Sequence, residues 1–216
     1  MVLEHYYWYF QSAIPHRVCD DIVKYGQLSK KKEILGLTGE LGVDRNAKDK
    51  PLSNKEMLNL KKKRDSNIVW MSDSWIYKEI HPYIHMANRN AGWNFEWDVS
   101  EECQFTKYSK GQYYGWHADS WGKPYDKPGP LYNKIRKLSV SVSLSDFLEY
   151  EGGALEFDFR NEDPSKSNKK KIQTCTQILP KGSLVVFPSF VWHRVTPVTA
   201  GTRYSLVLWN LGKPFV

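Results

Sequence analysis

The first hundred residues carry apolar positions at helical spacing. Pro15–Gly26 has one apolar stripe between an initial proline and a final glycine, which favours a helix. Ser53–Glu56 has the pattern of a capping box directly before an apolar run. A third apolar stripe extends through Ser72–Gly92 and ends at a glycine. The pattern therefore predicts three N-terminal helices.

From Asn94 onward the apolar positions change to a period of two. Leu138–Leu144 alternates without interruption, which predicts a strand with one polar face. Further strands are predicted in four segments that glycine-containing turns separate: Glu102–Tyr108, Leu155–Phe159, Leu184–Phe187 and Tyr204–Trp209. Short strands at this spacing are typical of a sandwich or barrel rather than of a parallel α/β sheet.

The two patterns together predict a mainly β protein of the α+β class with flanking N-terminal helices. We expect a single domain over residues 1–216, in which 1–93 form a helical support region and 94–216 form the β core. A chain of 216 residues can bury about 70% of its unfolded surface, so it can form a substantial core. With 41% hydrophobic and 25% charged residues, wholesale disorder is excluded.

Charge and cysteine content narrow the function classes only slightly. The 31 basic and 24 acidic residues give a net charge of +7, which permits an acidic partner without requiring one. No apolar run reaches the length of a membrane span, and the first residues lack the features of a signal peptide. The three cysteines are widely spaced and odd in number, which argues against a disulfide framework. We therefore expect a cytoplasmic protein with no membrane segment and no obligate partner.

Three basic runs and one long loop are further features of the pattern. The runs Lys30–Lys32, Lys61–Arg64 and Lys166–Lys171 are interpreted as solvated helix ends and hairpin loops. Residues 120–136 contain three prolines and are long enough to form a lid over a site.

Two of the six histidines occur in a pattern that favours metal binding. His117 and Asp119 are two positions apart in a segment interpreted as a strand, so their side chains can face the same side. His193 follows another apolar run, and a folded β scaffold would have to bring it to this pair. Two imidazoles and one carboxylate that leave positions open suit Fe(II) in oxygenases, although the same set also serves zinc hydrolases.

These residues, together with Arg203, resemble the iron(II)- and 2-oxoglutarate-dependent oxygenases. Similarity to the prolyl 4-hydroxylase-like branch is carried by four segments: Tyr108–His117, Glu151–Phe157, Pro180–Pro188 and Gly201–Trp209. The resemblance covers residues 102–210 well and the N-terminal region, including Arg64–Trp70, more loosely. It implies a double-stranded β-helix, or jelly roll, flanked by helices, which agrees with the independent interpretation of the apolar pattern.

The resemblance also implies the chemistry. His117, Asp119 and His193 would bind Fe(II) and form the catalytic centre. The cosubstrates would be 2-oxoglutarate and O2, with ascorbate as an accessory cofactor. The reaction would place a hydroxyl group on an unactivated C–H bond and release succinate and CO2.

Three further residues would form the cosubstrate pocket. The resemblance implies that Arg203 pairs with the distal carboxylate of 2-oxoglutarate, which suits the forked geometry of a guanidinium group. Tyr108 would be a second contact to the cosubstrate, and Trp209 would line the pocket on the same strand face as Arg203. Tyr108 and Trp209 could equally be ordinary core aromatic residues.

The substrate class stays open at this point. A prolyl residue in a polypeptide ranks first, and the aromatic residues near the motif that could form a docking wall are Tyr113, Tyr114, Trp116 and Trp121. A nucleic acid ranks lower, because the demethylase branch resembling AlkB expects a second arginine where this chain has Trp209. A free amino acid or small metabolite is an alternative. A zinc hydrolase and a non-catalytic binding barrel are alternatives of a different class.

Overall fold

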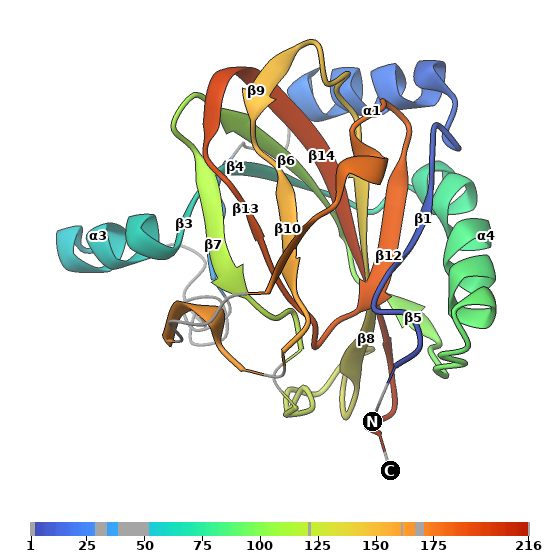
Figure 1. Ribbon diagram of the computed structural model, residues 1–216. Coiled ribbons are helices and arrows are strands. Elements are labelled where there is room, and N and C mark those ends of the chain that lie inside the picture. The colour runs from blue at the N-terminus through green and yellow to red at the C-terminus, as the bar shows by residue number, and fades with distance from the viewer. Residues whose placement is uncertain are drawn as a thin grey trace.

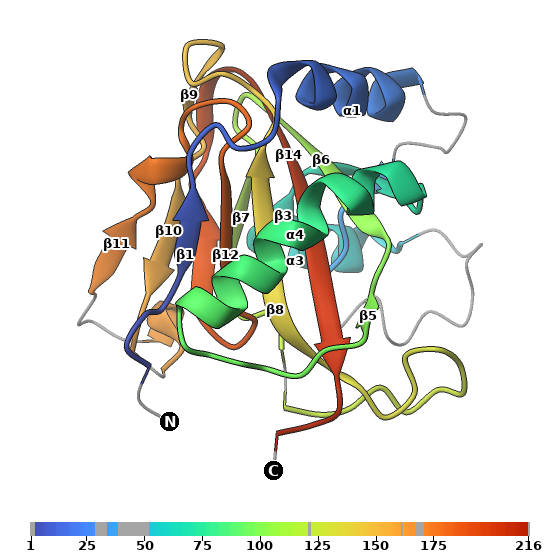
Figure 2. The same cartoon turned by 90° about the vertical axis from the view of Figure 1, so that its right-hand side faces the viewer.

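Two antiparallel β-sheets face each other, with helices packed against one of them (Figures 1 and 2). The computed structural model describes residues 3–28, 34–38, 52–120, 122–160, 162–166 and 171–215. The major sheet runs in the order β1 (Trp8–Phe10), β12 (Leu184–Pro188), β8 (Ile135–Ser143), β14 (Val198–Gly212), β6 (Cys103–Ser109), β4 (Asn67–Met71) and β2 (Ile34–Leu35), and β5 (Val99–Ser100) and β9 (Tyr150–Gly152) also pair with β14. The minor sheet runs in the order β11 (Ile172–Thr174), β10 (Leu155–Asp158), β13 (Trp192–Val195), β7 (Tyr113–His117) and β3 (Arg64–Asp65).

The three predicted helices are present. They are α1 (His16–Leu28), α3 (Asn54–Lys63) and α4 (Ser74–Asn90), and two short 3-10 turns cover Pro164–Lys166 and Thr176–Ile178. The predicted capping box begins α3, where the Ser53 hydroxyl accepts from the Glu56 N–H and the Glu56 carboxylate accepts from the Ser53 N–H. In the part of the chain that the structure describes, no helix has the length and apolar character needed to cross a bilayer.

Helices α1 and α4 lie across the outer face of the major sheet, whereas α3 projects to the side, next to β3 and β7 (Figures 1 and 2). The apolar stripes of α1 and α4 pack with the outward side chains of β8, β12 and β14 in one core cluster. A second cluster fills the space between the two sheets and contains the fully buried Phe157. The mainly β, jelly-roll prediction is confirmed.

The alternation in β8 separates the outer core from the inner cavity. Leu138, Val140 and Val142 belong to the outer cluster, so their apolar face packs against the helices. Ser139 and Ser141 lie on the opposite face and are also buried. The predicted polar face is therefore turned into the interior of the barrel rather than toward water.

The N-terminal region also supplies strands β1 to β4, which the sequence pattern did not predict. The prediction of residues 1–93 as a helical region therefore omits part of both sheets. These strands have two to five residues each. Runs this short cannot be assigned by periodicity, and long-range pairing with β6, β7 and β12 holds them in place.

Candidate active site

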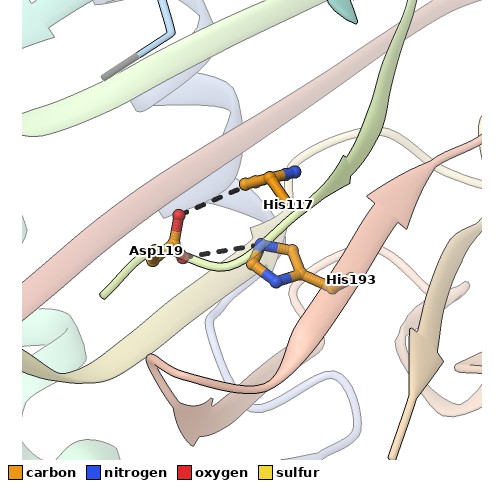
Figure 3. Close-up of side chains that lie close together, drawn as sticks. All are labelled: His117, Asp119 and His193. Atoms are coloured by element: carbon orange, nitrogen blue, oxygen red, sulfur yellow. Dashed lines mark ion pairs between the residues drawn. The ribbon is translucent and has the colours of Figure 1, made fainter. Parts of the chain in front are cut away.

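His117, Asp119 and His193 come together between the two sheets (Figure 3). His117 ends β7 and pairs directly with His193 of the neighbouring strand β13. Asp119 follows β7, where its backbone N–H donates to the carbonyl of Ser189 at 2.8 Å. Its two carboxylate oxygens lie 3.7 Å from Nε2 of His117 and 3.5 Å from Nε2 of His193. The predicted triad is thus brought together, with its ligand atoms within 4.8 Å of one another.

Backbone carbonyls hold both imidazoles in the orientation that a metal ligand needs. The Nδ1 atom of His117 lies 2.8 Å from the carbonyl oxygen of Gly115, and that of His193 lies 2.9 Å from the carbonyl oxygen of Val191. A carbonyl oxygen only accepts hydrogen bonds, so each ring hydrogen is on Nδ1. The Nε2 lone pairs are therefore free and face the Asp119 carboxylate.

Burial and neighbouring charges set protonation states that suit metal binding. Burial lowers the pKa of His117 to about 3, and the neighbouring His193 contributes to this shift. Burial alone would raise the pKa of Asp119, but the two histidines, Arg136 and the Ser139 hydroxyl lower it below its ordinary value. At neutral pH, His117 is therefore a neutral ligand and Asp119 is a carboxylate.

Aromatic rings from both sheets restrain the two histidines. Tyr114 stacks on His117 with ring centroids 3.6 Å apart and an interplanar angle of 10°. Phe187 of the major sheet meets His193 edge-on, with centroids 4.8 Å apart. Imidazoles fixed on several sides lose little rotamer freedom when they bind a ligand, which favours a preformed site.

A cavity of about 40 Å³ opens beside the triad, and all six predicted site residues border it. Arg203 of β14 pairs directly with Tyr108 of β6. Trp209 lies six positions after Arg203, on the same face of β14. Arg203, Tyr108 and Trp209 thus border the same cavity as the triad.

Arg203 is a buried cation without a carboxylate partner among the described residues. Its side chain is only 3% exposed, and its one hydrogen bond within the described chain goes from Nη1 to the Ser205 hydroxyl at 3.2 Å. Thr106, directly opposite Ser205 on β6, has a buried hydroxyl with no hydrogen-bond partner among the residues that the structure describes. The indole Nε1 of Trp209 is buried and, within the same residues, also has no partner. Buried polar groups are rarely left unpaired, so the cavity is built for a polar, anionic ligand.

Comparison with known proteins identifies the family. Residues 103–210, half of the chain, match the family described as the 2OG-Fe(II) oxygenase superfamily. The chain belongs to this superfamily. A PKHD-type hydroxylase of Synechococcus sp. (strain CC9605) is 36% identical over 104 residues, which are 48% of this chain and 39% of that protein. One of Xanthomonas campestris pv. campestris (strain B100) is 35% identical over 106 residues, 49% of this chain and 41% of that protein. The match thus spans about two fifths of these relatives.

Solved structures show the same fold at low sequence identity. The viral collagen prolyl hydroxylase of Paramecium Bursaria Chlorella virus-1 superposes with a TM-score of 0.60 and 18% identity, covering 97% of each chain. A prolyl hydroxylase of Trichoplax adhaerens, solved with a peptide fragment of the hypoxia inducible factor, has a TM-score of 0.65 and 17% identity, covering 96% of this chain and 84% of that one. The prediction of a prolyl 4-hydroxylase-like oxygenase is confirmed at the level of family and fold.

The residues of this oxygenase fit the iron and the cosubstrate that its superfamily uses. Two imidazole nitrogens with free lone pairs and one ionised carboxylate form a nitrogen and oxygen donor set suited to Fe(II). The guanidinium of Arg203, which has no carboxylate partner among the described residues, fits a carboxylate of 2-oxoglutarate, and the hydroxyl of Thr106 can donate to it.

One basic run gave a wrong interpretation. Lys61–Lys63 are exposed at the end of α3, as expected, but Arg64 is buried and borders the cavity. Its position could have distinguished Arg64 from the three lysines, because Arg64 follows the end of the helix and begins β3. Lys30–Lys32, Trp121 and residues 167–170 lie outside the described residues.

The sequence pattern also did not predict an ion pair at the rim of the site. Arg136 donates from Nε and Nη2 to the two carboxylate oxygens of Glu101, at 2.8 and 2.5 Å. Its guanidinium carbon lies 3.9 Å from the ring centre of Trp209. Tyr125, within the predicted lid, donates its hydroxyl hydrogen to Glu101 at 2.9 Å. This network ties the loop to a cavity residue.

Proposed function

We propose that this oxygenase is a 2-oxoglutarate-dependent dioxygenase that hydroxylates a prolyl residue in a polypeptide and releases succinate and CO2. The observation that carries the proposal is a preformed His117–Asp119–His193 triad in one cavity with the guanidinium of Arg203, which has no carboxylate partner in the described part of the chain. A zinc hydrolase would use the triad but would give no reason for a buried, unpaired arginine beside it.

The residues of the site have separate roles in this reaction. The Nε2 atoms of His117 and His193 and the carboxylate of Asp119 hold the metal. Arg203 holds the distal carboxylate of 2-oxoglutarate and so orients the cosubstrate. Iron(II), when bound with 2-oxoglutarate and O2, supplies the oxidising power for C–H hydroxylation.

The surroundings of the cavity keep water out and present the substrate. Tyr125 ties its loop to Glu101, whose partner Arg136 lies over Trp209, which supports a role for this loop in limiting solvent access. Tyr114 stacks on His117 beside the triad, where an aromatic ring suits an extended proline-containing segment, and Tyr113 and Trp116 lie on the same strand β7. The prolyl hydroxylases with this fold support the same substrate class, and ascorbate as an accessory cofactor stays a prediction.

The test is a turnover assay with Fe(II), 2-oxoglutarate and O2 against a panel of proline-containing peptides. We expect succinate to form and one oxygen atom to be added to a peptide, as mass spectrometry would show. The His193→Ala variant should lose both products. His85→Ala is the matched control, because His85 stacks on Trp97 at the distant helix α4 and should leave turnover unchanged.

Two outcomes would contradict the proposal at different levels. If no peptide is hydroxylated while a free amino acid or a methylated oligonucleotide is, the prolyl assignment is wrong and the dioxygenase assignment remains. If the metal-loaded protein does not bind or consume 2-oxoglutarate at all, the dioxygenase assignment is itself wrong.

A further inference from the structure

Arg64 is a second buried guanidinium at the cavity, and the proposed reaction with 2-oxoglutarate gives it no task. It is 4% exposed and forms no ion pair within the described chain. Its hydrogen bonds go to neutral acceptors: from Nε to the Ser66 hydroxyl at 2.7 Å, from Nη1 to the Leu37 carbonyl at 3.1 Å, and from Nη2 to the Gln104 side-chain carbonyl at 2.7 Å. A guanidinium group has five N–H donors, so one remains on each terminal nitrogen. A carboxylate can accept from both of these donors.

The position of Arg64 separates it from the cosubstrate subsite. Arg64 meets β6 at Gln104, whereas Arg203 lies opposite Tyr108, four residues further along the same strand. Four residues of extended chain span about 13 Å. The orphaned hydroxyl of Thr106 lies between these two levels. The two arginines therefore contact this wall at different levels, Arg64 at Gln104 and Arg203 opposite Tyr108.

Arg64 is also close to the metal-binding end of the cavity. Its guanidinium carbon lies 4.5 Å from the ring centre of Tyr114, and the same ring stacks on His117 at 3.6 Å. A group bound by Arg64 would thus lie about one aromatic ring away from a metal ligand. Arg64 and the triad also border the same cavity, so a substrate bound next to the metal can reach Arg64.

Counted over the described residues at the cavity, the charges of the loaded site leave one positive charge unbalanced. Arg64 and Arg203 are each positive and Asp119 is negative, while Arg136 is neutralised by Glu101. Iron(II) adds two positive charges and 2-oxoglutarate adds two negative ones. An isolated buried charge is unfavourable, so one further negative group would complete the balance.

We infer that Arg64 is a specificity-determining residue that binds a carboxylate of the substrate next to the C–H bond to be hydroxylated. The inference rests on the proposed dioxygenase function and narrows its substrate class to carboxylate-bearing molecules. The carboxylate can belong to an acidic side chain beside the reacting residue, to the C-terminus of a peptide, or to a free amino acid. The preference arises because a neutral substrate would leave the Arg64 charge without a partner.

The inference can be tested without turnover, by measuring how tightly the protein binds pairs of ligands that differ only in a carboxylate or an amide. The protein is loaded with Mn(II), which accepts the same nitrogen and oxygen ligands, and with 2-oxoglutarate. Calorimetry then compares acetyl-Gly-Pro-Asp-Gly-amide with its Asn counterpart, acetyl-Gly-Pro with its amide, and L-proline with L-prolinamide. We expect the carboxylate member of at least one pair to bind about tenfold more tightly or better. The pair that shows the preference identifies the source of the carboxylate.

Two variants connect the preference to Arg64. Arg64→Gln should bind both members of that pair equally while its affinity for 2-oxoglutarate changes less than about twofold. Gln104→Glu keeps the arginine and gives it an internal carboxylate in place of the carboxamide 2.7 Å from Nη2, so it should also remove the preference. Because the new carboxylate of Gln104→Glu pairs with the buried cation, this variant still tests the inference if Arg64→Gln misfolds. Arg17→Gln is the control, because Arg17 is exposed on α1 and should keep the preference.

Other outcomes overturn the inference. These are the absence of a carboxylate preference in all three pairs, or a preference that persists in Arg64→Gln and Gln104→Glu. A loss of 2-oxoglutarate binding in Arg64→Gln with the preference intact would instead assign Arg64 to the cosubstrate. Failure of the wild-type protein to bind 2-oxoglutarate contradicts the proposed function itself, so the two failures are distinguishable.

Discussion

The hydroxyl of Ser139 donates a hydrogen bond of 2.7 Å to Oδ2 of Asp119. Ser139 lies on β8 of the major sheet, whereas Asp119 follows β7 of the minor sheet. One hydrogen bond thus fixes the metal-binding carboxylate to the opposite wall of the barrel. The same hydroxyl lies 2.9 Å from the Ser189 hydroxyl, and the Ser189 carbonyl accepts from the Asp119 backbone N–H. The rotamer of the carboxylate is therefore set before any metal binds.

Ser139→Ala should weaken metal binding by about 10- to 100-fold, because the carboxylate loses the partner that orients it. The lost hydrogen bond also stabilised the ionised form, so the pKa of Asp119 should rise. Calorimetric titration with Mn(II) at neutral pH measures the affinity. Ser141→Ala is the matched control, because Ser141 is buried on the same strand face and no hydrogen bond joins it to Asp119. An equal effect of the two substitutions would mean that the Ser139 bond does not position the ligand.

Arg203→Lys should weaken 2-oxoglutarate binding by about tenfold or more, because a point charge replaces a fork that fits a carboxylate. Titration of the cosubstrate into Mn(II)-loaded protein gives its affinity, and titration of the metal alone should give the wild-type value. Unchanged cosubstrate affinity in Arg203→Lys and Arg203→Gln would place the distal carboxylate at another residue.

Local patterns were sufficient to predict the helices, the main strands and the His117–Asp119 pair of the triad. The helix α3 follows from its capping box, and β8 follows from seven alternating residues, Leu138–Leu144. His117 and Asp119 could be predicted as a pair because residues two positions apart on a strand lie close together in space. His193 and Arg203 were placed by resemblance to a family, since no local rule brings residues 74 or more positions apart into contact.

What sequence did not reveal depends on long-range packing. Ser139 was predicted on a polar face, but only the second sheet shows that this face is enclosed and meets Asp119. Arg64 follows three lysines in the sequence, so the pattern predicts that it is exposed with them at the end of the helix. Its burial follows from β3 pairing with β7 at Tyr114 and from the acceptor that Gln104 provides on β6.

The three cysteines should not react with thiol reagents while the protein is folded. Burial raises the pKa of Cys19 to about 11 and those of Cys103 and Cys175 to about 12. At pH 8 roughly one thiol in a thousand to one in ten thousand would be ionised, and the thiolate is the reactive form. Iodoacetamide should therefore label none of them at pH 8, and all three once guanidinium chloride unfolds the chain, as mass spectrometry would show.

An exposed thiol provides the control for this labelling. Lys55 is exposed on α3, so Lys55→Cys should be alkylated rapidly in the folded protein. Rapid labelling of any native cysteine at a rate close to that of this variant would mean that its surroundings open to solvent.

Gly153 allows Arg203 to reach its position, which makes it the glycine whose substitution should affect cosubstrate binding. Gly153 has φ +60°, and a Cβ atom there would lie 2.9 Å from Cδ of Arg203 and 3.0 Å from Cγ2 of Val198. Because Cδ is in the middle of the side chain, moving it displaces the guanidinium that bonds to Ser205. Gly153→Ala should therefore weaken 2-oxoglutarate binding by about tenfold and also destabilise the fold.

Gly111→Ala separates the two effects. Gly111 also has a left-handed backbone, with φ +86°, but a Cβ atom there would meet nothing within 4 Å. Each substitution should lower the free energy of unfolding by about 1–2 kcal/mol, because an L-residue is strained in this region. Chemical denaturation measures that loss, and calorimetry with 2-oxoglutarate measures binding. We expect only Gly153→Ala to lose cosubstrate affinity. Equal affinities in the two variants would show that the Arg203 side chain moves aside without displacing its guanidinium, and that the close contact has no part in the site.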